Sequence, residues 1–317
     1  MRLKPAFDLV FRPVPPYDFE KTVHKPSGWD LFTPFEQWEE GVLWTSAFLQ
    51  GRLFGLRLGS TGSVDRPRFG VRLYASTDVG AAEARALRGL LASKLAVEQD
   101  LGPFYRMAVR DPILRYPVRH LRGMRSTDPA HLFADVVLAL SLHMAPMKRS
   151  EDMMECFVRM YGGPAEFEGR TIQAWPTAVL AAGVAERSLR SRCKMGFRAK
   201  YVHACARMMS RGFPDTEDLA GMTSEEARAK LLELPGIGEY SVDILNPHGG
   251  FPIDSWTADV FGVLFKGKVP KNGRDAIAGI KAEGLRRWGS MAWLAFFYVV
   301  QDLPHLSEKL GLPLRLY

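Results

Sequence analysis

Two glycines in the segment LPGIG, residues 234–238, have the spacing to bind a phosphate group. Glycine reaches backbone angles that other residues avoid, and Pro235 favours the end of the preceding helix. Gly236 and Gly238 would leave backbone N–H groups uncovered where the next helix starts, and a phosphate oxygen binds such groups without a side chain. This helix-hairpin-helix pattern predicts DNA binding that is independent of base sequence. A tight connection between two helices, with no ligand, is the alternative.

Asp254 is the carboxylate with the best position for chemistry near this turn. It follows Gly249 and Gly250 and precedes a helical run over residues 257–265. Aspartate at a helix start commonly accepts hydrogen bonds from the first backbone N–H groups, so we expect Asp254 to cap that helix. A capping role and a catalytic role are compatible. Asp243 is the second-choice carboxylate, and is otherwise expected to be solvated or to cap a helix.

The hairpin, the helix after it and Asp254 resemble the helix-hairpin-helix DNA glycosylases of base excision repair. In that superfamily a GPD element ends in the catalytic aspartate, and Pro252-Ile253-Asp254 occupies the matching position. The resemblance is specific over residues 127–298, and its nearest branches are 3-methyladenine DNA glycosylase II and 8-oxoguanine DNA glycosylase. It implies that Asp254 stabilises positive charge on the deoxyribose as a damaged base departs, and orients or deprotonates the attacking water.

Tyr240 stands two positions after Gly238, where bifunctional members of the superfamily have a lysine. That lysine forms a Schiff base and nicks the strand, so its absence predicts a monofunctional hydrolase without AP-lyase activity. The 3-methyladenine branch has a tryptophan there, and Trp288 matches its pocket tryptophan in the pattern R-x-W-x-S-x-A. The resemblance therefore implies that Tyr240 and Trp288 sandwich a cationic alkylated purine. Helix packing is the alternative for Tyr240.

Two other functions stay open. The segment GFRAKYV, residues 196–202, resembles the 8-oxoguanine branch, so 8-oxoguanine or a deaminated base is an alternative lesion. From a different functional class, the alternative is a non-catalytic helix-hairpin-helix DNA-binding module. Only 14 positions separate Tyr240 from Asp254, several fewer than the superfamily leads us to expect. Pro247 should end the intervening helix early.

Further DNA contacts are expected at two places. The resemblance puts DNA-inserting residues at a junction of two helices, where this chain has His143 and Met144. Met144 is the candidate wedge that fills the base stack after a base is extruded, and a buried helix-end methionine is the alternative. Arg198 and Lys200 can reach phosphate, with surface salt bridges as the alternative.

The charge of the chain fits a polyanionic partner. Lys and Arg number 42 against 35 Asp and Glu, which gives a formal net charge of +7. We expect double-stranded DNA with a damaged base as the partner, a monomer, and no membrane association. One run predicts either a solvated helix face or a phosphate-contacting surface, because it is rich in arginine: Arg106, Arg110, Arg115, Arg119, Arg122 and Arg125.

Cofactor and compartment follow from the cysteines and the N-terminus. Cys156, Cys193 and Cys205 form no CxxC, so we expect no disulfide framework, no thiolate metal site and a reducing cytoplasm, beside the nucleoid if the source is prokaryotic. The four-cysteine iron–sulfur cluster of some superfamily members is expected to be absent. The histidines lack metal-ligand spacing, so no metal site is expected. No cofactor should be required, although the resemblance allows a monovalent cation on hairpin carbonyls. No signal peptide is evident.

The predicted fold is α+β. An N-terminal antiparallel β-rich α+β domain, residues 1–102, precedes a mainly helical two-lobed glycosylase region, residues 103–317. Its lobes are 127–250, with the hairpin, and 103–126 plus 251–317. Alternating apolar residues predict strands at FDLVF, GVLWTSAFLQ, RLFGLRLG and FGVRLYAS. Helices are predicted over 79–96, after Thr127-Asp128-Pro129, over 172–209 with breaks at Gly183 and Met195-Gly196, after a capping box at Thr223-Ser224-Glu225-Glu226, and over 285–298.

Overall fold

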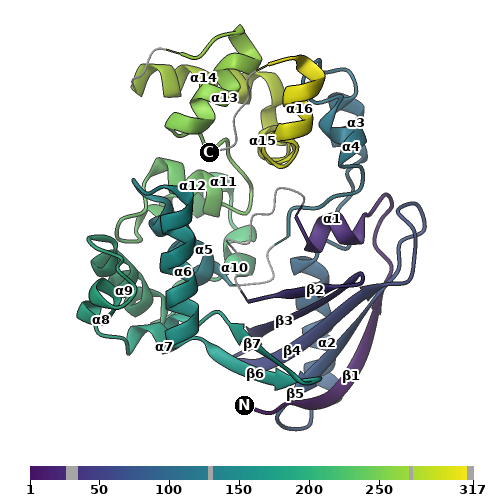
Figure 1. Cartoon of the computed structure of the whole chain (residues 1–317), viewed down its shortest axis with the longest axis vertical. Helices are drawn as coiled ribbons and strands as arrows, with labels where there is room; N and C mark the ends of the chain where they lie inside the picture. The colour runs from purple at the N-terminus through teal and green to yellow at the C-terminus, as the bar shows by residue number, and fades with distance from the viewer. Residues whose placement is uncertain (26–34, 128–130, 271–273, 313–317) are drawn as a thin grey trace. The chain divides into compact units, whose positions relative to one another are not determined.

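The computed structural model describes residues 1–25, 35–127, 131–270 and 274–312 (Figure 1). It confirms the α+β fold, in which antiparallel strands combine with many helices. Close contacts divide the chain into two compact units. The first unit contains Met1–Asp100, Gly123–Glu217 and Leu234–Gly236, and the second contains Leu101–Arg122, Asp218–Glu233 and Ile237–Tyr317. The division into residues 1–102 and two later lobes stays a prediction.

A five-stranded antiparallel sheet lies in the first unit, with the strand order β1-β5-β4-β3-β2. Four strands form where alternation of apolar and polar residues predicts them. Strand β3 departs from one-sided burial, since the five consecutive residues 43–47 are all buried. The short strand β2 was not predicted. The strands are β1 (Lys4–Phe11), β2 (Gln37–Glu39), β3 (Val42–Leu49), β4 (Arg52–Ser60) and β5 (Phe69–Ala75).

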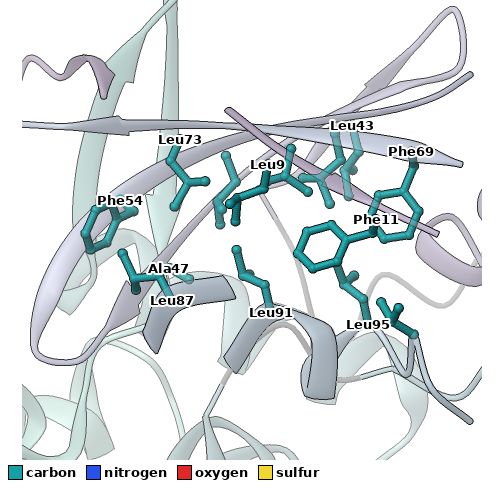
Figure 2. Packing of buried hydrophobic residues seen from close by; sticks show 14 of the residues in the cluster. Leu9, Phe11, Leu43, Ala47, Phe54, Phe69, Leu73, Leu87, Leu91 and Leu95 are labelled. Carbon is teal, nitrogen blue, oxygen red and sulfur yellow. The ribbon is translucent and has the colours of Figure 1, made fainter. Parts of the chain in front are cut away.

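Helix α2 (Ala81–Lys94) packs against one face of this sheet and closes the main core of the unit (Figure 2). Leu87 and Leu91, one turn apart on the helix, lie in one buried cluster with Leu9 and Leu73 from the strands. The predicted helix over residues 79–96 is therefore confirmed. Burial of these side chains is the main source of stability for a layer of this kind.

A β-hairpin packs against the sheet through a second buried cluster that includes Trp44, Tyr74 and Ile172. The predicted helical start at Ile172 is therefore wrong, because this residue lies in a strand. Strands β6 (Gly163–Phe167) and β7 (Arg170–Ala174) pair antiparallel. Their apolar residues alternate, and Glu168 and Gly169 have φ values of 47° and 73°, as a two-residue hairpin turn requires. Phe167 packs so closely on Gly55 that a Cβ there would lie 2.5 Å from its ring.

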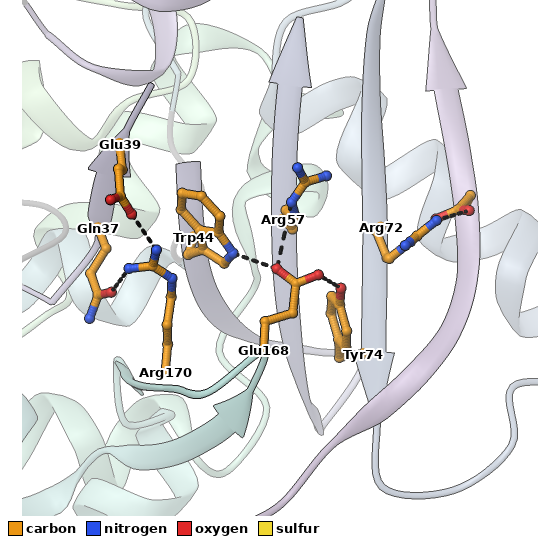
Figure 3. Close-up of polar contacts among 9 residues, drawn as sticks. Gln37, Glu39, Trp44, Arg57, Arg72, Tyr74, Glu168 and Arg170 are labelled. Atoms are coloured by element: carbon orange, nitrogen blue, oxygen red, sulfur yellow. Dashed lines mark hydrogen bonds and ion pairs between the residues drawn. The ribbon is translucent and has the colours of Figure 1, made fainter. Parts of the chain in front are cut away.

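Glu168 joins this hairpin to the sheet through three polar contacts (Figure 3). Trp44 Nε1 donates to Glu168 Oε2 at 2.7 Å, the Tyr74 hydroxyl donates to Oε1, and Arg57 Nε lies 3.5 Å from Oε2. Burial alone would raise the pKa of Glu168, but hydrogen bonds from Tyr74 and Trp44 lower it below the usual value. A charged carboxylate therefore holds the hairpin in place.

Helices complete the first unit. Residues Asp128 and Pro129 of the predicted helix start lie outside the described residues, and the helix begins after His131, whose Nδ1 accepts from Ala134 N at 3.3 Å. The predicted breaks near Gly183 and Gly196 are confirmed. The helices are α1 (Phe19–Val23), α5 (Leu132–Leu142), α6 (Met147–Tyr161), α7 (Ala178–Ala182), α8 (Glu186–Ser191) and α9 (Arg198–Met209), and α10 (Thr216–Ala220) follows them in the chain.

Arg125 departs from both predictions made for the arginine-rich run. Its side chain is completely buried, and its guanidinium donates to the carbonyl oxygens of Gly123, Val14 and Gln99 at 3.0–3.1 Å. It also lies over the ring of Tyr17. Arg125 is therefore a core residue, whereas the other five arginines of the run are exposed.

The second unit is helical. The capping box at Thr223 and Glu226 is confirmed. The single helix predicted over 285–298 is wrong, because Gly289 takes φ 52° and interrupts it after Trp288. In the described part of the chain, every helix is too short or too polar to cross a bilayer. The helices are α3 (Gly102–Ala108), α4 (Pro117–His120), α11 (Ser224–Leu232), α12 (Glu239–Leu245), α13 (Ser255–Lys266), α14 (Arg274–Trp288), η1 (Gly289–Met291), α15 (Ala292–Gln301) and α16 (Leu303–Leu310).

Candidate active site

Asp254 caps α13, as predicted. Its Oδ1 accepts hydrogen bonds from the backbone N and the hydroxyl of Thr257, each at 2.8 Å, and its own backbone N donates to the Thr257 hydroxyl at 2.8 Å. These bonds fix the carboxylate at the start of the helix. Among the described residues, every hydrogen bond to this carboxylate goes to Oδ1. Oδ2 is therefore available to accept from a ligand, and the residue is only partly buried.

The segment before Asp254 is anchored by apolar packing. Phe251 is completely buried and contacts the rings of Phe261 and Phe296. It lies so close to Gly284 of α14 that a Cβ there would be 2.2 Å from its ring. The backbone that presents Asp254 is thus held by the core of the second unit, and a catalytic group on such a support keeps its geometry.

Asp243, the second-choice carboxylate, is neither solvated nor a helix cap. It is 4% exposed and forms ion pairs with Arg228, whose Nη1 lies 3.2 Å away, and with Lys281. A Cβ at Gly250 would lie 2.7 Å from its Cα and Cβ atoms. Both of its carboxylate oxygens are occupied by cations, so Asp243 joins α11, α12 and α14 and has a structural role.

Trp288 is placed like a core residue. It is 4% exposed, and its described ring contacts are to Phe251, Phe261 and Phe265. Its Nε1 donates to Asp111 Oδ2 at 3.0 Å. The structure therefore favours packing for Trp288 over the base sandwich inferred from the resemblance. Asp111, which was not predicted, fixes the indole, and no motif in the sequence indicated it.

Tyr240 lies in the first turn of α12 and is partly buried. The helix ends at Leu245, as Pro247 predicts. The short loop that follows is held by side-chain bonds: Asn246 Oδ1 accepts from His248 N at 3.0 Å, and its Nδ2 donates to Ser224 O at 3.2 Å. The short segment between α12 and Asp254 is therefore a loop held in place by hydrogen bonds.

The two hairpin glycines serve different purposes. Gly236 has φ +84°, and a Cβ there would lie 2.6 Å from the ring of Tyr201. Both the backbone conformation and the lack of space therefore require glycine at this position. Gly238 has φ −118°, which any residue can adopt, so the prediction of special backbone angles is wrong for it. Nothing lies within 4 Å of a Cβ at Gly238, and this open space is what close approach of a phosphate needs.

Met144 lies in the turn between α5 and α6, and it is 94% exposed. The alternative of a buried helix-end methionine is therefore wrong. Its φ of +48° is uncommon for a residue with a side chain. His143 is partly buried, and burial, together with the nearby Arg198 charge, lowers its pKa below the ordinary value. The turn therefore presents the thioether side chain of Met144 to solvent.

Arg198 supports that turn from α9. It is 8% exposed and donates from Nη2 to the carbonyl oxygen of His143. Burial, and then the Arg149 charge, lower its pKa. This placement favours a structural role over the phosphate contact predicted from sequence. Lys200 is exposed, with its Nζ 4.6 Å from the centre of the Tyr201 ring, and remains a candidate for DNA contact.

Comparisons with known proteins identify relatives of this chain, although no family model matches it. A "Probable N-glycosylase/DNA lyase" of Methanothermobacter thermautotrophicus is 26% identical over an alignment of 192 residues, which covers 53% of this chain and 61% of the relative. A "DNA-3-methyladenine glycosylase" of Bacillus subtilis is 26% identical over 163 residues, 50% of this chain and 54% of the relative. The chain thus spans somewhat more than half the length of these curated relatives.

Solved structures show the same fold over nearly the whole chain. A 3-methyladenine DNA glycosylase from Archaeoglobus fulgidus gives a TM-score of 0.75 at 17% identity and covers 93% of this chain and 98% of its own. An 8-oxoguanine glycosylase/lyase of Clostridium acetobutylicum, in complex with DNA containing cytosine opposite 8-oxoG, gives 0.71 at 17% identity, with 98% of each chain covered. These relatives and neighbours confirm the resemblance to the helix-hairpin-helix DNA glycosylases.

Proposed function

We propose that this chain, whose relatives and structural neighbours are helix-hairpin-helix DNA glycosylases, is itself a monofunctional DNA glycosylase. It would extrude a damaged base from duplex DNA and hydrolyse the N-glycosidic bond with Asp254 as the essential carboxylate. The observation that carries this proposal is the state of Asp254: Oδ1 is fixed by the cap on α13, while the described contacts leave Oδ2 to a ligand.

The chemistry requires a fixed negative charge. As the base departs, positive charge builds on the deoxyribose, and a preorganised carboxylate stabilises it without having to reorganise. The same Oδ2 can orient a water or accept its proton. Because Thr257 and the helix start hold Oδ1, the carboxylate does not need to change rotamer during the reaction. Asp243 would not replace it, since Arg228 and Lys281 occupy both of its oxygens.

The proposal of a monofunctional enzyme rests on Tyr240 and Lys281. A strand-nicking glycosylase needs an amine that attacks the sugar carbon as a nucleophile. The position two residues after Gly238 holds Tyr240, and Lys281 of the same unit is ion-paired with Asp243. Hydrolysis by water would therefore leave an intact abasic strand.

DNA engagement is proposed for the hairpin and for the turn at Met144. The open space at Gly238 suits a phosphate oxygen against the backbone N–H groups at the start of α12. Met144, exposed at the turn, suits insertion into the base stack, where an apolar side chain lowers the cost of flipping a base. Lys200 would add a phosphate contact.

An alkylated purine is the proposed lesion. Tyr240 gives an aromatic face in place of lysine, and one relative is named for 3-methyladenine. The burial of Trp288 weakens the sandwich that sequence suggests, so Tyr240 would be the main aromatic contact. The segment at residues 196–202 favours 8-oxoguanine as a second candidate.

A panel of duplexes with methylated, deaminated and oxidised bases tests these points together. Each duplex is incubated with the protein and then analysed with and without hot alkali, and a parallel sample contains borohydride. We expect cleavage only after alkali, on a methylated-purine duplex, and no trapped adduct. Cleavage without alkali, or a trapped protein–DNA adduct, would show a lyase. Binding without base release from any duplex would support the non-catalytic DNA-binding module.

A further inference from the structure

Three side chains with metal-binding chemistry converge in the second unit, and none of them has a role in the proposed reaction. His120 ends α4, Asp302 precedes α16, and His305 lies in the first turn of α16. One ligand atom from each lies within 4.8 Å of the other two. Asp302 and His305 are three positions apart, at the N-cap and in the first turn of α16. His120 is 182 positions from Asp302, so its approach could not be predicted.

Asp302 is the centre of this cluster. Its side chain is 1% exposed, its Oδ1 lies 2.5 Å from His120 Nδ1, and its Oδ2 lies 3.0 Å from His305 Nδ1. All ion pairs of Asp302 within the described residues involve these two imidazoles. A carboxylate so thoroughly removed from water needs hydrogen-bond donors or a cation beside it. No lysine or arginine of the described chain pairs with it, and a cation bound by this carboxylate and the two imidazoles would supply that compensation.

The three ligand atoms lie near enough to one another to bind one small ion. With bonds of about 2.0–2.1 Å to nitrogen and oxygen, adjacent ligands of a tetrahedral zinc ion stand roughly 3.3 Å apart. His120 Nδ1 and His305 Nδ1 lie 2.5 Å and 3.0 Å from different oxygens of Asp302, which are hydrogen-bond distances, so the side chains would move apart and exchange these hydrogen bonds for bonds to the ion. The two imidazole rings are neighbours, with centroids 4.1 Å apart and planes tilted by 36°. The His120 side chain is 50% exposed, which gives an ion access from solvent.

We propose that His120, Asp302 and His305 bind one divalent transition-metal ion, with Zn²⁺ the best match. Two imidazoles and one carboxylate are a common zinc ligand set, and solvent fills the fourth position. Mg²⁺ and Ca²⁺ prefer oxygen ligands and fit this set poorly. The ion would join α4 to α16, two elements that are far apart in sequence. Because the unfolded chain does not present the three ligands together, binding stabilises the folded state.

Zinc titration of the full-length protein tests the site. The chain is treated with a chelator, exchanged into buffer and titrated with Zn²⁺ by calorimetry, and Co²⁺ is added to a parallel sample to read its visible absorption. We expect about one ion per chain, an intense tetrahedral Co²⁺ spectrum, and a Tm that rises with Zn²⁺ concentration. DNA is absent from these measurements, so they do not depend on the proposed function.

His120→Ala and His305→Ala are the informative variants, and His248→Ala is the matched control. His248 is exposed in the loop after α12 and belongs to no such cluster among the described residues. We expect each cluster variant to bind Zn²⁺ at least about tenfold more weakly and to lose the Co²⁺ spectrum, while the control matches the wild type. Since His120 is half exposed, its variant should fold, which circular dichroism checks. Absence of Zn²⁺ binding by the wild type, or unchanged binding by His120→Ala, would overturn the proposal.

Discussion

At the scale of single residues, Asp254 and Met144 each combine a distinctive structural feature with a proposed role in the reaction. The Oδ1 atom of Asp254 caps α13, and its Oδ2 atom is available to accept a hydrogen bond from a ligand. Met144 has a positive φ, which costs conformational energy, and its side chain is almost fully exposed to solvent. The Arg198 guanidinium donates a hydrogen bond to the carbonyl oxygen of the neighbouring residue His143. Positions with strain of this kind are more common at functional sites than elsewhere.

Substitution of Met144 should separate function from stability. Met144→Ala removes an exposed side chain, so the Tm should stay close to that of the wild type. If Met144 is the wedge, release of the base should slow by about tenfold, because extruding the base becomes more costly. Fluorescence of 2-aminopurine beside the lesion reports extrusion directly. Val179→Ala, which shortens another exposed apolar residue, is the control. Equal rates for both variants and the wild type would exclude the wedge role.

At the scale of elements, two tight turns depend on particular residues for their backbone conformation: the helix-hairpin-helix turn and the turn of the β6–β7 hairpin. The helix-hairpin-helix turn depends on Gly236 beside Tyr201, while Gly238 leaves its surroundings open. The β6–β7 hairpin depends on the left-handed backbone at Glu168 and Gly169, and on the carboxylate of Glu168. Both turns are held by side chains from elements distant in sequence.

The two hairpin glycines should respond differently to alanine. Gly236→Ala places a methyl group against the Tyr201 ring at a positive φ, so it should lower the free energy of unfolding by on the order of 2 kcal/mol. Gly238→Ala should cost less stability than Gly236→Ala, since only the weaker N-cap of α12 is affected, but it should weaken binding to undamaged duplex DNA, because the methyl group occupies space needed by phosphate. Urea unfolding and fluorescence anisotropy measure the two effects. Full DNA affinity in Gly238→Ala would argue against a phosphate at this position.

The carboxylate of Glu168 should contribute more to the free energy of unfolding than that of Glu166 in the same hairpin. Glu168→Ala leaves Trp44 Nε1 and the Tyr74 hydroxyl without their acceptor, which should cost about 2 kcal/mol in urea unfolding. Glu166→Ala is the control, since that side chain is more than half exposed. Because the folded state lowers the pKa of Glu168, its contribution is present at neutral pH and is lost as pH falls below the ordinary value near 4.5. An equal effect of both variants would contradict this role.

At the scale of the whole molecule, sequence predicts local features well and long-range ones poorly. Strands β1, β3, β4 and β5, the Thr223 capping box and the Asp254 cap depend on neighbouring residues, and all were predictable. The burial of Arg125 was not, because its carbonyl partners include Val14, more than a hundred positions away. Trp288 likewise matches a pocket motif in sequence, but its environment is set by Phe251 from the loop before α13 and by Phe261 from α13. Side-chain role is decided by packing that no local pattern encodes.

The central claim is that Asp254 performs the chemistry, and one comparison tests it most directly. Single-turnover release of the base is measured for the wild type, Asp254→Asn and Asp259→Asn on the duplex that the panel identifies. Asparagine caps a helix about as well as aspartate, so Asp254→Asn should fold normally. We predict that it loses at least about 100-fold in rate, because it lacks the negative charge, while Asp259→Asn, on the same helix, stays near the wild type. Full base release by Asp254→Asn would contradict the account.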